Sequence, residues 1–122
     1  MRVLFAETRT LTQADFDAFA RISGDDNPIH VDPAFAARTR FGRTVAHGMM
    51  LYSVLWTLVR RHRPGARQAA QSLMFPSPAF ADEKLVFEGR ERDDDAATIA
   101  LEVRRVADGT VVCQAAVTAE PR

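Results

Sequence analysis

The segment GMMLYSVLWTLV, residues 48–59, is the longest apolar run of the chain and dictates the architecture that we expect. The run continues at helical spacing, which predicts one long helix from Gly48 to about His62. Because almost no polar face interrupts it, we expect this helix to be buried on nearly all sides. Pro64-Gly65 then stops the helix.

The chain after this helix shows the alternation of β-strands instead of a helical period. Polar turns separate the strands: Asp93-Asp94-Asp95 forms one, and Asp108-Gly109 is typical of a short hairpin. We predict an antiparallel meander of four strands, over residues 68–75, 84–92, 98–107 and 110–120. A sheet wrapped around one buried helix makes a single α+β domain over residues 1–122. Its uncovered sheet edges favour pairing with a second copy.

The chain before the long helix predicts one strand and two shorter helices. Residues 2–7 are apolar and suit a strand. Thr12 is a good N-cap for a helix over residues 13–22, because Asp15 places a carboxylate in its first turn. A short helix over residues 33–37 begins with proline, which suits the first helical position.

The loop between these helices, SGDDNPIH at residues 23–30, carries a carboxylate and an imidazole five residues apart. Asp25 and His30 can activate water and deliver a proton, if the loop holds them in a defined geometry. Asn27 is expected mainly to shape the loop, with a polar contact to the site. The alternative is an Asx-type turn beside a surface histidine, and the spacing alone favours this alternative.

The segment Ala46-His47-Gly48 offers a second set of groups where the long helix begins. The N–H of Gly48 points out of the positive end of the helix dipole. It can polarise a carbonyl oxygen that becomes an oxyanion, a contribution of about 3–4 kcal/mol for one donor. Alternatively, Gly48 only eases a turn or a packing contact. We expect His47 to line the pocket or to bond locally at the helix start.

The remaining composition excludes several functions. Sixteen basic residues balance sixteen acidic ones, so we expect neither nucleic acid nor a membrane surface as a partner. The three histidines lack metal-ligand spacing, and no metal is expected. Cys113, the single cysteine, lies in an apolar strand and is expected to be a packed thiol. With no signal peptide visible and no run of roughly 20 apolar residues, a cytoplasmic location is expected.

One local cluster of basic residues allows two interpretations. It could meet the phosphates of a coenzyme or carrier arm. A solvated helix end that complements the dipole is the better interpretation. The cluster comprises Arg60, Arg61, Arg63 and Arg67.

Two segments together closely resemble the MaoC-like hydratases, which include the (R)-specific enoyl-CoA hydratases. The segments are FARISGDDNPIHVDP, residues 19–33, and VAHGM, residues 45–49. A Gly-Asp-x-Asn-Pro-x-His core followed by Ala-His-Gly-Met is specific, and the resemblance covers roughly residues 16–51. It implies a hot-dog fold, in which an antiparallel sheet wraps a long helix. It also implies a homodimer or higher homo-oligomer, with sites near the subunit interface.

The resemblance implies reversible hydration of trans-2-enoyl-CoA to (R)-3-hydroxyacyl-CoA, with the CoA thioester as substrate and no cofactor. Asp25 and His30 match the catalytic pair. Asp25 would deprotonate the attacking water, and His30 would assist that water or protonate the α-carbon. Gly48 matches the glycine whose N–H holds the thioester oxygen, and Asn27 and His47 are assigned to substrate binding beside it.

Other functions remain open at this stage. The substrate could be a 3-hydroxyacyl carrier protein, or a branched or dicarboxylic acyl-CoA. A non-catalytic acyl-CoA-binding module of the hot-dog fold is the third possibility. Intact Asp25, His30 and Gly48 argue against a degenerate site.

Three positions depart from the family's pattern. Asp26 puts a second carboxylate next to the pair, where many relatives are apolar. Trp56 stands near the place where hydratases often carry a serine that supports the pair, which leaves Ser53 and Thr57 as substitutes. Ala81-Asp82-Glu83 replaces a common Gly-Asp turn, so that hairpin is expected to differ.

Overall fold

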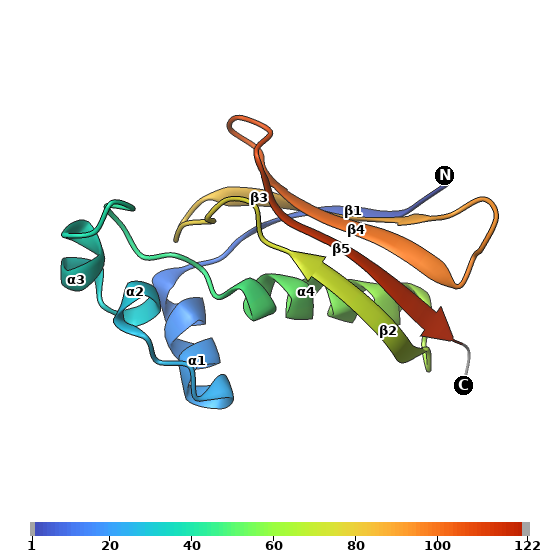
Figure 1. Ribbon diagram of the computed structural model, residues 1–122, viewed down its shortest axis with the longest axis horizontal. Coiled ribbons are helices and arrows are strands. Elements are labelled where there is room, and N and C mark those ends of the chain that lie inside the picture. The colour runs from blue at the N-terminus through green and yellow to red at the C-terminus, as the bar shows by residue number, and fades with distance from the viewer. Residues whose placement is uncertain (1, 121–122) are drawn as a thin grey trace.

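The computed structural model describes residues 2–120 and shows a five-stranded antiparallel sheet packed against one long helix (Figure 1). The strands are β1 (Arg2–Thr10), β2 (Arg67–Met74), β3 (Lys84–Glu91), β4 (Thr98–Arg105) and β5 (Val111–Glu120). Their order across the sheet is β1-β3-β4-β5-β2, so β1 and β2 form its two edges. The predicted α+β class is confirmed. The four-stranded meander is wrong in part, because only β3, β4 and β5 follow one another in the sheet, while β2 pairs with β5 and not with β3.

Helix α4 (Gly48–His62) lies along one face of the sheet, with the bounds that the sequence predicts. The three shorter helices gather beyond its N-terminal end (Figure 1). They are α1 (Gln13–Ser23), α2 (Pro28–Val31) and α3 (Pro33–Ala37). None of the described helices is long and apolar enough to cross a membrane.

The hydrophobic core fills the space between α4 and the sheet. Leu55, Leu58 and Val59 of α4 are fully buried, as are Phe87 of β3 and Val103 of β4. Alternate side chains of β3, β4 and β5 point into this layer, so the opposite face of these strands carries the polar residues. The edge strand β2 has no buried side chain. Each fully buried apolar side chain of this size contributes roughly 1.5–3 kcal/mol to the free energy of unfolding. The core therefore fixes α4 against the sheet.

The N-cap of α1 matches the prediction, and a glycine caps its C-terminal end. The Asp15 N–H donates to the Thr12 hydroxyl at 3.2 Å, and the Thr12 N–H donates to the Asp15 carboxylate at 2.8 Å. Gly24 ends the helix in the left-handed region at φ 81°, where glycine is favoured, and its N–H donates to the Ala20 carbonyl. This cap sets the point at which the Asp25 loop leaves α1.

Helix α2 lies where we expect a loop from the sequence. Two further predictions about the helices and strands are wrong. Helix α4 is not buried on nearly all sides, because the sheet covers one side and leaves Met49, Ser53 and Thr57 exposed. Strand β1 does not end near residue 7, since Thr10 still pairs with Lys84 of β3. An edge strand is held by backbone hydrogen bonds and tolerates polar side chains, so its composition hides its length.

The turn before β3 has an aspartate at the position where the backbone is left-handed. Asp82 adopts φ 69°, in the left-handed region that aspartate tolerates better than most residues. The Glu83 carboxylate accepts a hydrogen bond from the Phe80 N–H at 2.7 Å, and the Asp82 N–H donates to Leu11. Glycine is therefore not needed at this turn.

Glu88 is the one carboxylate among the described residues that is buried, at 7% exposed. It lies on the polar face of β3, where its carboxylate accepts hydrogen bonds from Arg90 and from Arg104 at 3.2 Å. Burial raises the pKa of Glu88, but the hydrogen bonds and charges of the two arginines outweigh burial and hold it below 4.5. The contribution of ionised Glu88 to the free energy of unfolding is therefore complete above pH 4.5. It is lost as the pH falls through the lower pKa that Glu88 has in the folded state.

We predict that Glu88→Gln lowers the free energy of unfolding by about 1–3 kcal/mol at pH 7, because both arginines lose a charged acceptor. Urea unfolding at pH 7 and below pH 4 measures the loss, which shrinks in acid. Glu120→Gln is the matched control, because its pair with Arg67 is exposed and should contribute no more than about 1 kcal/mol. Equal losses in the two variants would contradict the assignment.

Candidate active site

The loop that carries Asp25 is shaped by short local hydrogen bonds. The Asp25 N–H donates to the Ser23 hydroxyl at 3.1 Å, and the Asp25 carboxylate accepts from the Asn27 N–H at 3.4 Å. The Asp25 side chain is 55% exposed. Its backbone is therefore constrained, while the carboxylate faces solvent.

Helix α2 positions His30, and Asn27 starts that helix. The Asn27 side chain accepts a hydrogen bond from the Ile29 N–H at 3.1 Å, and Pro28 occupies the first helical position. The expectation that Asn27 shapes the loop is confirmed, through an N-cap. Its assignment to substrate binding stays a prediction, and its side-chain oxygen already has a structural partner.

The orientation of His30 is set by the chain just before α4. Its Nδ1 lies 2.7 Å from the carbonyl oxygen of Val45, which can only accept, so Nδ1 carries the proton. Val45 is itself fixed, because its N–H donates to the Ile29 carbonyl and it forms a β-bridge with Phe80. The neutral ring therefore presents an unprotonated Nε2 to the site.

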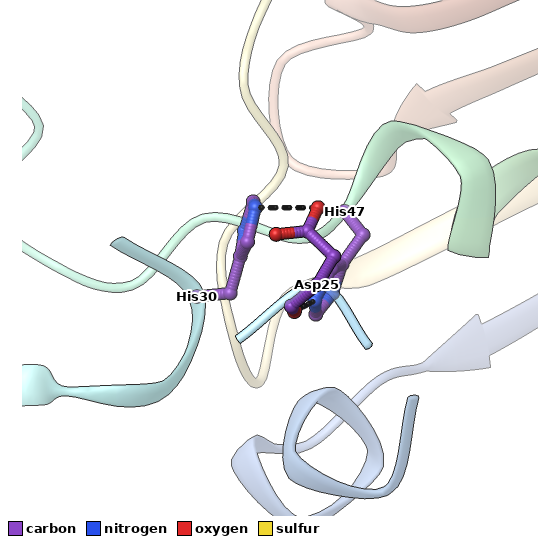
Figure 2. Close-up of side chains that lie close together, drawn as sticks. All are labelled: Asp25, His30 and His47. Carbon is purple, nitrogen blue, oxygen red and sulfur yellow. Dashed lines mark hydrogen bonds and ion pairs between the residues drawn. The ribbon is translucent and has the colours of Figure 1, made fainter. Parts of the chain in front are cut away.

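The structure brings Asp25 and His30 together, as the sequence predicts. The Nε2 of His30 lies 3.6 Å from Oδ2 of Asp25, and Figure 2 shows the two side chains facing each other. The distance exceeds that of an ordinary direct hydrogen bond. Two acceptors at this separation can both bind one water molecule. The Asx-turn alternative is also realised locally, but His30 is not a surface histidine, since its side chain is only 14% exposed.

Gln13 is a residue of the site that sequence reasoning missed. Its amide N–H donates to the His30 carbonyl at 2.8 Å, and its amide oxygen accepts from the buried Thr44 hydroxyl at 2.6 Å. Gln13 thereby links α1, α2 and the segment before α4. Its partners lie 17 and 31 residues away, so no local pattern could have revealed it.

His47 is buried beneath the pair, at 2% exposed. Its Nε2–H donates to the backbone carbonyl of Asp25 at 2.8 Å, and its ring stacks on His30 with centroids 3.9 Å apart. The ring of Phe19 packs beside it at 4.9 Å. The prediction of a local bond at the helix start is wrong, because His47 makes no side-chain cap bond and reaches a partner 22 residues away.

The charge state of His47 follows from its burial. Burial lowers the pKa of His47 below 6.5, and this outweighs the opposing hydrogen bond to the Asp25 carbonyl. His47 is therefore neutral near pH 7. Its other ring nitrogen, Nδ1, is buried and has no hydrogen-bond partner within residues 2–120.

Asp25, His30 and His47 each offer a ligand atom within 4.8 Å of the others, a clustering that their spacing in the sequence does not indicate. A metal ion lies close to the plane of each imidazole that binds it, along the lone pair of the nitrogen. The two rings are stacked with an interplanar angle of 23°, so their planes do not meet near either nitrogen. Joint ligation would require a ring to rotate. The absence of a metal stays a prediction, supported by this stacking.

Gly48 begins α4 beside a pocket of about 330 Å3. The pocket is lined mainly by apolar residues, with Leu51 and Phe75 among them and Arg40 as its charged member. A Cβ on Gly48 would lie 2.8 Å from the Phe75 ring, so Gly48 allows this ring to pack closely against the start of α4. This contact agrees with a packing role for Gly48. The proposed approach of a ligand to the Gly48 N–H stays a prediction.

The expected substitutes for the missing serine do not reach the pair. The Ser53 hydroxyl donates to the Met49 carbonyl at 2.7 Å, and the Thr57 hydroxyl donates to the Ser53 carbonyl at 2.9 Å. Both side chains lie on the exposed flank of α4. Their hydroxyl protons are used within the helix itself.

The other sequence assignments agree with the structure. Cys113 is fully buried, and burial raises the pKa of its thiol to about 11, so it is a packed thiol. Arg63 pairs with Glu91 at 2.8 Å, and Arg67 pairs with Glu120 at 2.7 Å. These pairs favour a structural role for the basic helix end.

Comparison with known proteins shows the family of the chain. Residues 1–112 match the family described as the MaoC like domain. The chain belongs to the MaoC-like family. It is 43% identical over 77 residues to an (R)-specific enoyl-CoA hydratase of Aeromonas caviae, a match that covers 62% of this chain and 58% of that protein. It is 36% identical over 80 residues to a mitochondrial 3-hydroxyacyl-[acyl-carrier-protein] dehydratase of Arabidopsis thaliana, covering 66% of this chain and 48% of that protein.

The MaoC-like chain thus spans about half the length of the curated relatives it matches. Its fold matches over a greater length. The solved structure of an (R)-hydratase from A. caviae superposes with a TM-score of 0.86 at 30% identity, covering 97% of this chain and 93% of that one. The fold is the hot-dog fold, as the resemblance implies.

We predict that Asn27→Ala lowers the free energy of unfolding by about 1 kcal/mol, because α2 loses its N-cap. Asn27→Asp should retain most of the stability, since a carboxylate oxygen accepts the same Ile29 N–H. Urea unfolding of both variants at pH 7 measures the difference. If Asn27→Ala were as stable as Asn27→Asp, the cap would not hold α2.

Proposed function

We propose that this MaoC-like chain hydrates trans-2-enoyl-CoA reversibly to (R)-3-hydroxyacyl-CoA. The observation that carries the proposal is the 3.6 Å approach of His30 Nε2 to Asp25 Oδ2. His47, which contacts both residues, directly precedes Gly48 at the N-terminus of α4. The 43% identity with the A. caviae hydratase supports this chemistry over a binding module without catalysis.

In the proposed reaction the pair binds and activates one water molecule. The Asp25 carboxylate and the unprotonated Nε2 of His30 both accept hydrogen bonds, so they orient the water oxygen toward the β-carbon. A C–O bond forms there as one water proton passes to the pair. A proton then reaches the α-carbon from the same side, which completes a syn addition of water. Either residue can deliver it.

The third proposed group stabilises the charge that develops on the substrate. Attack at the β-carbon moves electrons onto the thioester oxygen and makes it enolate-like. The Gly48 N–H belongs to the first turn of α4, whose amides have no acceptor within the helix. Donation to the thioester oxygen would lower the barrier by about 3–4 kcal/mol.

These groups suffice for the proposed chemistry without a cofactor, since acid, base and oxyanion donor all come from residues 1–122 as one domain. The CoA thioester is the substrate, and no nucleic acid takes part in the proposal. The cytoplasmic location stays a prediction.

A second candidate is dehydration of a 3-hydroxyacyl group on a carrier protein. The similarity to the Arabidopsis dehydratase favours it, because that protein acts on an acyl-carrier-protein substrate by name. The chemistry at the acyl group is the same reaction in reverse. The two candidates differ only in what holds the thioester.

We predict that the wild-type protein hydrates crotonyl-CoA, measured as loss of the conjugated enoyl absorbance. Asp25→Asn and His30→Ala should each lower kcat/KM by about 10²–10⁴-fold, because each removes an acid–base group. Asp26→Asn is the matched control beside the site and should retain most of the activity. Circular dichroism checks that each variant is folded.

Two results would contradict this proposal in different ways. A folded wild type that is inert on short, medium and branched enoyl-CoA would remove the hydratase assignment. Equal activities of Asp25→Asn and Asp26→Asn would remove the residue assignment instead. Activity on enoyl carrier protein without activity on enoyl-CoA would select the second candidate.

We also propose that two copies pair through the β2 edge of the sheet. Strand β2 is hydrogen-bonded to β5 on one side only, and an open edge is a template for another strand. Exposed apolar side chains cluster near this edge and the start of α4: Met74 is 58% exposed, Phe75 43% and Met49 46%. A second copy would cover them.

We predict that the wild-type protein sediments as a dimer at micromolar concentration and that Met74→Lys shifts it toward monomer, because a charge would enter the interface. Val106→Lys is the matched control, since Val106 is also half exposed but follows β4, which is an internal strand of the sheet. Sedimentation velocity separates the species. A monomeric wild type would refute the pairing.

A further inference from the structure

The hydroxyl groups of α4 do not support the proposed catalytic pair. Those of Ser53 and Thr57 donate to carbonyls of their own helix. A pair that must orient one water molecule still needs fixed geometry. The support must therefore come from elsewhere in the fold.

His47 is the residue that touches both members of the pair. It donates from Nε2 to the backbone carbonyl of Asp25 at 2.8 Å, which fixes the start of the loop relative to α4. Its ring face lies against the ring of His30, with centroids 3.9 Å apart and an interplanar angle of 23°. Figure 2 shows the three side chains close together, with the Asp25 carboxylate facing the His30 ring.

We propose that His47 is a positioning residue: its Nε2–H fixes the Asp25 backbone and its ring face fixes the His30 imidazole, so that both present to one water molecule. The catalytic part of this inference rests on the proposed function. The geometric part stands on these contacts alone. It revises the expectation that His47 binds substrate.

The surroundings of His47 exclude direct chemistry with a substrate in this arrangement. The residue is 2% exposed, and the ring of Phe16 meets it edge-on at 6.5 Å, while Phe19 packs against it at 4.9 Å. Nε2 is occupied by the Asp25 carbonyl, and Nδ1 is enclosed. Because its neighbours hold His47 on several sides, it can fix their positions but does not exchange protons with a substrate.

Neutrality suits this role. The titratable groups that face His47 are His30 and Asp25, and burial keeps the pKa of His47 below 6.5. Because His47 stays uncharged near pH 7, His30 can accept a proton during the reaction without a second cation stacked on its face. Donation to a carbonyl also fixes the Nε2–H tautomer of His47.

Two substitutions separate the two contacts. His47→Phe keeps an aromatic ring against His30 but loses the hydrogen bond to Asp25. His47→Gln keeps an N–H donor that can reach the Asp25 carbonyl but loses the ring. We expect His47→Phe to lower kcat for crotonyl-CoA hydration by up to about 10²-fold, the scale of a small misplacement of catalytic groups, with KM unchanged. His47→Gln should recover part of the loss.

A measurement independent of activity tests the geometry. Nitrogen-15 imidazole spectra of the wild type should show His47 as a neutral Nε2–H ring at about pH 7 to 8, and neutral His30 as the Nδ1–H tautomer. In His47→Phe the His30 signals should shift, because the ring that packs on His30 changes. His62→Asn, at the far end of α4, assigns the third histidine and should leave the His30 signals unchanged.

The outcomes distinguish the failure of each idea. An inactive wild type with the expected spectra removes the proposed function and leaves the positioning geometry intact. Unchanged His30 signals and unchanged kcat in His47→Phe would overturn the inference. A raised KM with unchanged kcat would also overturn it, because His47 would then serve substrate binding.

Discussion

The packing of α4 against the sheet determines where the site can form. Leu55 and Leu58 are fully buried against the strands, so α4 cannot slide or rotate without exposing them. Its N-terminus is consequently fixed beside the Val45–Phe80 bridge, and the amide of Gly48 points out at that place. The short helices α1 to α3 gather at the same end (Figure 1). Reactive side chains can then be assembled around one rigid helix terminus.

The connection between this scaffold and the reactive loop is carried by a few polar contacts over long sequence distances. His47, the residue directly before α4, donates a hydrogen bond to the Asp25 carbonyl. Gln13 of α1 forms hydrogen bonds with His30 and Thr44. Each bond is buried or partly buried, where an unpaired donor or acceptor costs about 1–3 kcal/mol. Alternative loop arrangements are disfavoured for that reason. The loop is held by its backbone, and this leaves the Asp25 carboxylate free.

Local sequence signals predicted most of the fold because they are local in physical origin. The capping box at Thr12 and the stop at Pro64-Gly65 depend on neighbouring residues, and the bounds of α1 and α4 follow from them to within a residue. Strand β1 was underestimated, because its last residues are polar and its pairing with β3 is a long-range property. The exposed flank of α4 was missed, since apolar composition does not say how much sheet is available to cover it.

The site was predicted in part for the same reason. Asp25 and His30 share one loop, and their approach follows from a turn and a short capped helix. The roles of His47 and Gln13 depend on contacts between segments 17 to 31 residues apart, which no spacing rule describes. From the sequence alone, His47 is interpreted as a residue that bonds at the start of its own helix. Only the fold shows that its partner is the loop.

In the segment from Asp25 to His30, the backbone is held by the fold, and the side chains of the pair are available for the reaction. Helix α2 has four residues, too few to be stable alone, so its shape depends on the Asn27 cap and the Gln13 bond to His30. The Asp25 carboxylate, by contrast, is 55% exposed and accepts one long hydrogen bond of 3.4 Å, which adds little to the fold. A side chain that contributes little to folding can change protonation or bind water without disturbing the structure. The backbone supplies the rigidity that acid–base chemistry requires, and the side chain stays available for the reaction.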